Sequence, residues 1–127
     1  MSLILRSLQI VKKYWLIITG LILVAITVLS LWPLATLPSV PGTDKTHHLI
    51  GYAVLMFPVA LRQPRCWGWI GVALLVYSGG IELVQPYVNR YGEWLDLAAN
   101  AGGLFCGWLL AMVLNCFDSR RLSAQDR

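Results

Sequence analysis

A long run without any charged residue is the feature that most constrains the fold of this chain. From Tyr14 to Thr43 there is no Asp, Glu, Lys, Arg or His. Tyr14-Trp15 and Trp32 bracket a stretch of roughly 19 apolar residues, about the length of one membrane crossing. Aromatic side chains are enriched where a span meets the membrane surface. The sequence therefore predicts a first membrane span over about residues 14–32.

The composition supports a membrane protein. Of the 127 residues, 57% are hydrophobic and 13% are charged, against about 25% charged in an ordinary soluble domain. A soluble chain of this length could not bury so much apolar surface. The net charge is +4, but the basic residues lie near the two ends and in short loops, without an aromatic-rich basic surface. We therefore expect a single membrane domain with membrane lipids, and not nucleic acid, as its partner.

A basic segment before an apolar run can also be a secretory signal. This run is long for the apolar core of a signal, and no A-x-A-like cleavage site follows it. An uncleaved first span is therefore the better interpretation, and residues 1–13 form a short amphipathic lead-in.

Proline, glycine and capping residues divide the rest of the chain. The segment 34–43 is rich in Pro and Gly and is predicted to be a loop. Asp44 is favourable at the start of the next helix, and Pro86 ends the one after it. Within one domain, 1–127, helices are predicted over about 14–32, 44–61, 67–85 and 93–117.

The turns between these helices are short, which predicts an all-α antiparallel bundle of four transmembrane helices. Lys and Arg favour the cytoplasmic side of a membrane. In this topology one side holds eight of them and the other side holds two, Lys45 and Arg90. The prediction is a multi-pass protein with both termini in the cytoplasm. The eight are Arg6, Lys12, Lys13, Arg62, Arg65, Arg120, Arg121 and Arg127.

The second predicted helix carries a polar stripe that begins at its first residue. Asp44, His48 and Tyr52 are spaced i, i+4 and i+8, so they share one face. Lys45 lies at the rim of that stripe. His47 is about 100° away from His48 around the helix and is expected to face water or lipid headgroups.

The third and fourth helices carry similar stripes toward the same, outer end. Glu82 and Gln85 share one face of the third helix, and Asp96 and Asn100 share one face of the fourth. On the fourth helix this face continues inward as Gly103-x-x-x-Gly107, a spacing that lets a neighbouring helix approach closely. We therefore expect an outward-facing polar pocket above an apolar bundle.

Three motifs lie in order on three successive helices: Asp44-Lys45-x-x-His48-x-x-x-Tyr52, Glu82-x-x-Gln85 and Arg90-x-Gly92-x-x-x-Asp96-x-x-x-Asn100-x-x-Gly103-x-x-x-Gly107. Over about residues 38–115 they resemble the VanZ-like family of bacterial membrane proteins, named after a protein associated with low-level teicoplanin resistance. The resemblance implies a bacterial inner-membrane location. It implies a functional set of Asp44, Lys45, His48, Tyr52, Glu82, Gln85, Arg90, Asp96 and Asn100, with Gly103 and Gly107 in helix packing. Glu93 and His47 depart from the family pattern and change the charge of the pocket.

Three interpretations of these polar residues stay open. The pocket would bind a cell-envelope lipid, a lipid-linked precursor or a lipoglycopeptide, and contribute to teicoplanin resistance. Alternatively, the residues form a structural network in a membrane or assembly protein, since buried polar groups need partners. The third interpretation, an enzyme acting on a lipid-linked substrate, is less favoured because no Ser or Cys nucleophile faces the pocket.

The sequence predicts no cofactor and no metal. His48, Glu82 and Asp96 are suitable ligand types, but there is no H-x-x-x-H or similar local pair to support a metal site. The three cysteines are widely spaced, without a C-x-x-C pair, and are expected to be free thiols. No protein partner is predicted.

Overall fold

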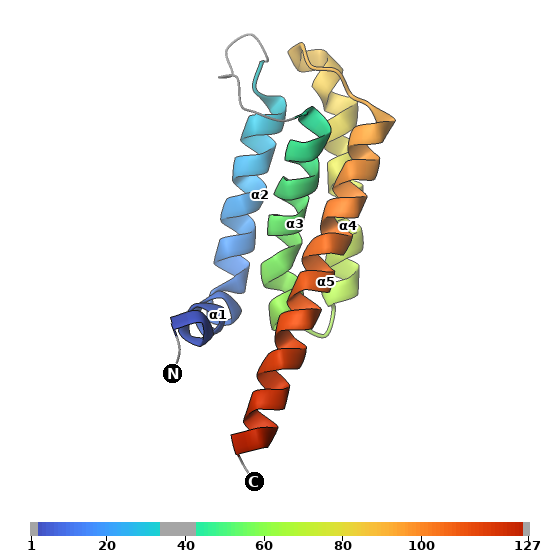
Figure 1. Cartoon of the computed structure of the whole chain (residues 1–127). Coiled ribbons are helices and arrows are strands. Elements are labelled where there is room, and N and C mark those ends of the chain that lie inside the picture. Colours follow the sequence, from blue (N-terminus) through green and yellow to red (C-terminus); the bar gives the residue numbers. More distant parts are fainter. Residues whose placement is uncertain (1–2, 34–42, 126–127) are drawn as a thin grey trace.

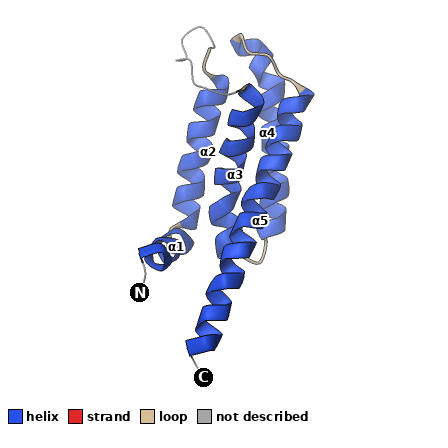
Figure 2. Cartoon of the chain, viewed as in Figure 1, coloured by secondary structure: helices blue, strands red, loops and turns tan. Residues whose placement is uncertain are grey.

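The computed structural model describes residues 3–33 and 43–125, and this part of the chain is all-helical. Five α-helices and one 3₁₀-helix follow one another in the described ranges: α1 Leu3–Lys13, α2 Trp15–Leu31, α3 Asp44–Arg62, α4 Trp67–Val84, η2 Gln85–Val88 and α5 Trp94–Gln125 (Figure 2).

Local sequence signals explain where α3 begins and ends. The side chain of Thr43 accepts a hydrogen bond from the backbone N–H of Thr46, and Asp44 occupies the first turn. Both features stabilise a helix start, because they satisfy free N–H groups and oppose the positive end of the helix dipole. After Arg62, Gln63 adopts a left-handed conformation with φ of 51° and donates its N–H to Val59. This is a common way for a helix to end.

The four long helices, α2 to α5, lie side by side, and α1 crosses near one end of them (Figure 1). α1 is bent by 80° against α2, so residues 3–13 do not extend the first long helix. α3 contacts each of the other α-helices and packs most extensively on α5. The core therefore follows α3, where Leu55 and Val59 are completely buried.

Two glycines allow α3 and α5 to approach so closely. A Cβ atom at Gly103 would overlap the backbone carbonyl oxygen of Leu49, and one at Gly107 would overlap that of Ala53. Any larger residue at either position would push the two helix backbones apart. The Gly103-x-x-x-Gly107 face of α5 is thus the face against which α3 packs.

The outside of the structure is largely apolar. α2, α4 and α5 expose large hydrophobic side chains such as Leu21, Trp69, Val76 and Phe105. A surface of this kind is unfavourable in water but suited to lipid. Among the described residues, two helical segments, Trp67–Val88 and Trp94–Ser119, are long and apolar enough to cross a membrane.

The number of candidate spans rises to three if the bent pair of α1 and α2 counts as one. The sequence predicts four spans, and the other two, α2 and α3, each fall short of the length or the low charge of a membrane span. α2 alone has 17 residues, and α3 carries charged residues at both ends. Because α3 lies among the other helices, its buried polar residues His48 and Tyr52 face protein, which is where such residues are tolerated in membrane helices.

Two segments differ from, or lie outside, the sequence-based expectations. α5 continues to Gln125 instead of ending near Phe117. At the start of this extension, Lys12 Nζ of α1 lies 3.4 Å from Asp118 Oδ2. The predicted loop over 34–43 lies outside the described residues, except for Thr43.

Candidate functional site

Polar residues gather at the end of the molecule where α2 and η2 end and α3 and α5 begin. Three contacts between the helix ends and the segments that adjoin them define this end. Gln85 Nε2 donates to the backbone oxygen of Ser30 at 3.2 Å, Arg90 Nη1 donates to that of Trp32 at 3.5 Å, and Lys45 Nζ donates to Glu93 Oε2 at 2.8 Å. We define the polar cluster as Asp44, Lys45, His48, Glu82, Arg90, Glu93, Asp96 and Asn100.

The inner part of the polar cluster is a hydrogen-bonded chain across three helices. His48 Nδ1 of α3 lies 2.9 Å from Asn100 Oδ1 of α5, and Asn100 Nδ2 donates to Glu82 Oε1 of α4 at 3.5 Å. Glu82 Oε1 is also 3.8 Å from His48 Nδ1. All three side chains are buried. Asn100 therefore links the imidazole to the carboxylate and ties the three helices together.

The rim of the polar cluster is half-exposed and carries charges of both signs. The side chains of Asp44, Lys45 and Glu93 are 53%, 44% and 50% exposed. Arg90 is buried beneath them, with Nη2 at 3.7 Å from Asp44 Oδ1. A ligand that approaches from outside would therefore meet these three side chains before the buried ones.

Negative charge exceeds positive charge in the polar cluster. Four carboxylates (Asp44, Glu82, Glu93 and Asp96) face two cations (Lys45 and Arg90). The ionised cluster, with neutral His48, thus carries a net charge of −2.

Two buried carboxylate oxygens have no hydrogen-bond partner among the described residues. They are Glu82 Oε2 and Asp96 Oδ1. Lys45 Nζ lies 3.8 Å from Asp96 Oδ1, which is an ion pair but too long for a hydrogen bond. Buried oxygens of this kind usually have a partner, so they mark positions where the cluster can accept a donor or a cation.

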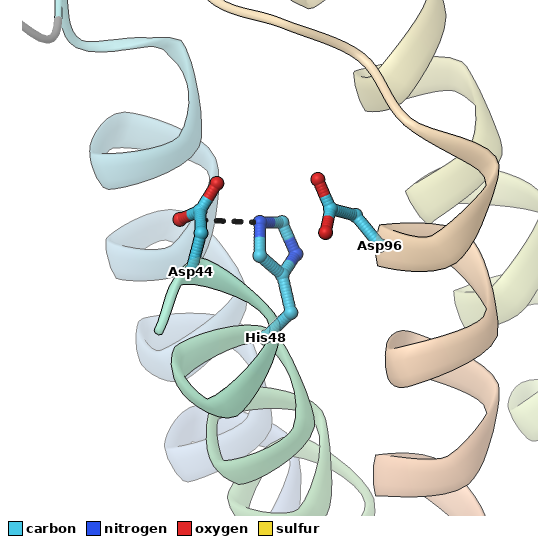
Figure 3. A group of neighbouring side chains, drawn as sticks. All are labelled: Asp44, His48 and Asp96. Atoms are coloured by element: carbon cyan, nitrogen blue, oxygen red, sulfur yellow. Dashed lines mark ion pairs between the residues drawn. The ribbon is translucent and has the colours of Figure 1, made fainter. Parts of the chain in front are cut away.

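Three side chains of the polar cluster converge on one point between α3 and α5. Asp44, His48 and Asp96 each offer one ligand atom, and these atoms all lie within 4.8 Å of one another. Figure 3 shows the two carboxylates on opposite sides of the imidazole ring. His48 Nε2 faces Asp44 Oδ1 at 3.9 Å, so this ring nitrogen points away from Asn100.

The nine site residues that the resemblance implies do not all belong to this network. Seven of them lie in the polar cluster. Tyr52 is buried one turn further along α3, against Gly103 of α5. Gln85 is buried but reaches across to α2. His47 is exposed, in line with its position about 100° from His48.

Glu93 is the member of the polar cluster that the implied site residues leave out. It makes the shortest ion pair described, at 2.8 Å from Lys45. Glu93 departs from the pattern of the VanZ-like family. However, it precedes Asp96 by only three residues, so both residues lie at the same helix start. That spacing is the signal that could have identified it.

The described cavity does not coincide with the polar cluster. It is an apolar groove between α4 and α5, lined by Leu75, Val76, Gly79, Trp94, Leu97, Ala98 and Ala101. Ser78, the hydroxyl nearest to Glu82 along α4, is completely buried and donates to the backbone oxygen of Leu75. That hydrogen bond and burial make Ser78 unsuited to act as a nucleophile.

Scans of the chain against protein-family models, curated proteins and solved structures gave no match. The resemblance to the VanZ-like family therefore stays a prediction carried by the motifs.

Proposed function

We propose that this chain is a four-span protein of the bacterial inner membrane, an antiparallel bundle with both termini in the cytoplasm. The apolar exterior of α2, α4 and α5 supports this proposal, because each would present hydrocarbon to lipid. α3 would cross the membrane among the others, with its polar face turned toward α5. The excess of Lys and Arg at the opposite end supports an extracytoplasmic position for the polar cluster.

In this protein the polar cluster binds the headgroup of a cell-envelope lipid or lipid-linked precursor. The observation that carries this proposal is the half-exposed rim of Asp44, Lys45 and Glu93 above a buried polar network. Since two of the three rim side chains are acidic and the whole cluster is negative, the ligand carries an amine. A phosphoethanolamine headgroup would place its amine beside Asp44 and Glu93 and its phosphate beside Lys45.

The experiment that tests headgroup binding is native mass spectrometry of the full chain, released from membranes of mixed phosphatidylethanolamine and phosphatidylglycerol. We expect retention of phosphatidylethanolamine. Glu93→Gln removes one rim carboxylate and should weaken retention several-fold. Asp118→Asn makes a comparable charge change at the other end of the bundle and should have no effect. Equal retention of both lipids by the wild type, or equal loss in the two variants, would contradict the proposal.

The resemblance to the VanZ-like family adds a cellular expectation, a contribution to teicoplanin resistance. Cells that produce the wild type should survive teicoplanin better than cells that produce Glu82→Gln. Membrane abundance of both proteins must be equal for this comparison, because Glu82 is buried and its substitution affects folding as well. If survival falls only in proportion to abundance, the polar cluster is a structural network instead.

A catalytic role is the second candidate, and one observation favours it. His48 lies between the carboxylates of Asp44 and Glu82, at 3.9 and 3.8 Å, an arrangement suited to a general base. With Ser78 engaged, an activated water would be the nucleophile. Turnover of a lipid-linked substrate by the purified wild type, lost in His48→Gln, would establish catalysis in place of binding.

A further inference from the structure

We propose that Asp44, His48 and Asp96 form a binding site for a divalent transition-metal ion such as Zn²⁺ or Mn²⁺. His48 Nε2 and one oxygen of each carboxylate are the protein ligands, and solvent completes the coordination. The site lies within the polar cluster, but this inference does not depend on headgroup binding.

The geometry of the three side chains is close to that of a metal site. Their ligand atoms lie within 4.8 Å of one another. Bonds of about 2.0–2.2 Å to zinc bring neighbouring ligand atoms to roughly 3.0–3.5 Å, so the widest gap has to close by about 1.3–1.8 Å. Asp44 can supply its share of this movement because its side chain is 53% exposed at the start of α3. The gap between His48 and Asp96, which are both buried, would have to close by rotation of those two side chains.

Hydrogen bonds prepare the imidazole of His48 to act as a ligand. Asn100 Nδ2 donates to Glu82, which leaves Asn100 Oδ1 to accept from His48 Nδ1 at 2.9 Å. The proton is thereby placed on Nδ1, and Nε2 keeps the lone pair that a metal needs. Metal-binding histidines usually donate their other ring N–H to an acceptor in this way.

Asp96 provides the independent indication that a ligand belongs here. Asp96 is 2% exposed, and its Oδ1 accepts no hydrogen bond from any described residue. The carboxylate points toward the His48 ring in Figure 3. The ion pair with Lys45, at 3.8 Å, leaves this buried oxygen without a hydrogen bond. A cation between Asp96 and His48 would satisfy it at bonding distance.

The charges of the polar cluster also suit a divalent ion. The net charge of −2 in the ionised cluster equals the charge that such an ion would neutralise. Lys45 and Arg90 are the competing cations, at 3.8 Å from Asp96 and 3.7 Å from Asp44. Both have other acceptors, Glu93 and the backbone of Trp32, so a bound metal would not leave them without partners.

The test uses the full chain, purified in detergent with a tag that contains no histidine and stripped with a chelator. Zn²⁺ or Mn²⁺ is then added, unbound metal is removed, and the metal content is measured by mass spectrometry. We expect one ion per chain and a higher unfolding temperature with metal. His48→Gln and Asp96→Asn should weaken binding roughly tenfold or more, as loss of metal-site residues generally does.

Matched variants separate this site from adventitious binding. His47→Gln, the same substitution one residue away, and Asp118→Asn, at the other end of the bundle, should bind metal like the wild type. Asp44→Asn changes a half-exposed ligand in place of a buried one, and it should also weaken metal binding. Failure of the wild type to hold either metal, or equal loss in His47→Gln and His48→Gln, would overturn the proposal.

Lipid retention measured in chelator distinguishes this proposal from the proposed function. Metal binding without preference for phosphatidylethanolamine would contradict only the proposal of headgroup binding. Lipid preference without metal binding would contradict only the proposal of a metal site.

Discussion

His48 Nδ1 and Asn100 Oδ1 lie 2.9 Å apart, although 52 positions separate the two residues in the chain. This contact joins the first turns of α3 to the first turns of α5. It lies within one helical turn of the point where Gly103 contacts the backbone of α3. A polar bridge and a close glycine contact thus hold the two helices in the same register.

The polar bridge should contribute to stability. Asn100→Leu keeps a similar volume but leaves His48 and Glu82, both buried, without the amide that joins them. Each unsatisfied buried group costs about 1–3 kcal/mol, so we expect a clear fall in the free energy of unfolding. Asn115→Leu, which removes a partly buried bond to the backbone of Leu61, should cost less. Denaturation of both variants in the same detergent measures the difference, and equal losses would argue against the bridge.

The close contact between α3 and α5 predicts different results at two adjacent glycines. A Cβ at Gly103 would overlap the backbone of Leu49, whereas one at Gly102 would lie 3.8 Å from Leu49 Cδ1, an ordinary contact. Gly103→Ala should therefore destabilise the protein by about 1–3 kcal/mol through overpacking. Gly102→Ala should be neutral or slightly stabilising, because alanine favours helix. Thermal unfolding of the pair is the measurement, and the reverse order would be inconsistent with the packing.

Lys45 should matter more for stability than the other ion-paired lysine. Its partner Asp96 has a side chain that is 3% exposed, whereas Lys12 and Asp118 are each 29% exposed. Lys45→Met would leave a buried carboxylate without its cation, and Lys12→Met would leave a partly solvated one. We expect the unfolding temperature to fall by several degrees in Lys45→Met and little in Lys12→Met. Similar small changes of the unfolding temperature in both variants would mean that Asp96 is neutral or has a partner other than Lys45.

The proposed topology predicts which introduced cysteines an impermeant thiol reagent can reach in whole cells. The background must first lack Cys66, Cys106 and Cys116, because all three are exposed free thiols. Tyr87→Cys, at a highly exposed position beside the polar cluster, should then react from outside. Arg65→Cys, exposed at the opposite end, should react only after lysis. The reverse pattern would invert the orientation.

Much of the helical organisation can be predicted from the sequence, because local signals determine it. Thr43 and Asp44 mark the start of α3, and Pro86 marks the end of α4. The predicted bounds 44–61 and 67–85 each differ by one residue from those of α3 and α4. The face of a helix on which a residue lies also follows from local geometry. For this reason the inward direction of His48 and the outward direction of His47 could be predicted.

The features that depend on tertiary contact could not be predicted in the same way. The bend of 80° between α1 and α2 occurs without a proline or glycine in the residues that join them. The extension of α5 past Phe117 involves a contact with Lys12 from the other end of the chain. Similarly, the convergence of Asp44 and Asp96 on His48 depends on the register of α3 against α5, which no motif states.

The central position of α3 has a consequence for how the protein is made. α3 leaves the ribosome before α4 and α5, yet the partners of His48 and Lys45 lie in α5 or directly before it. In the proposed topology, a nascent chain that ends before Asp96 would hold these polar groups without their partners, which makes insertion of α3 among lipids costly at that stage. We therefore expect α3 to reach its final position only after α5 has been made. Truncation before α5 is therefore expected to release α3 from the membrane interior, whereas truncation after Gly107 is expected to retain it.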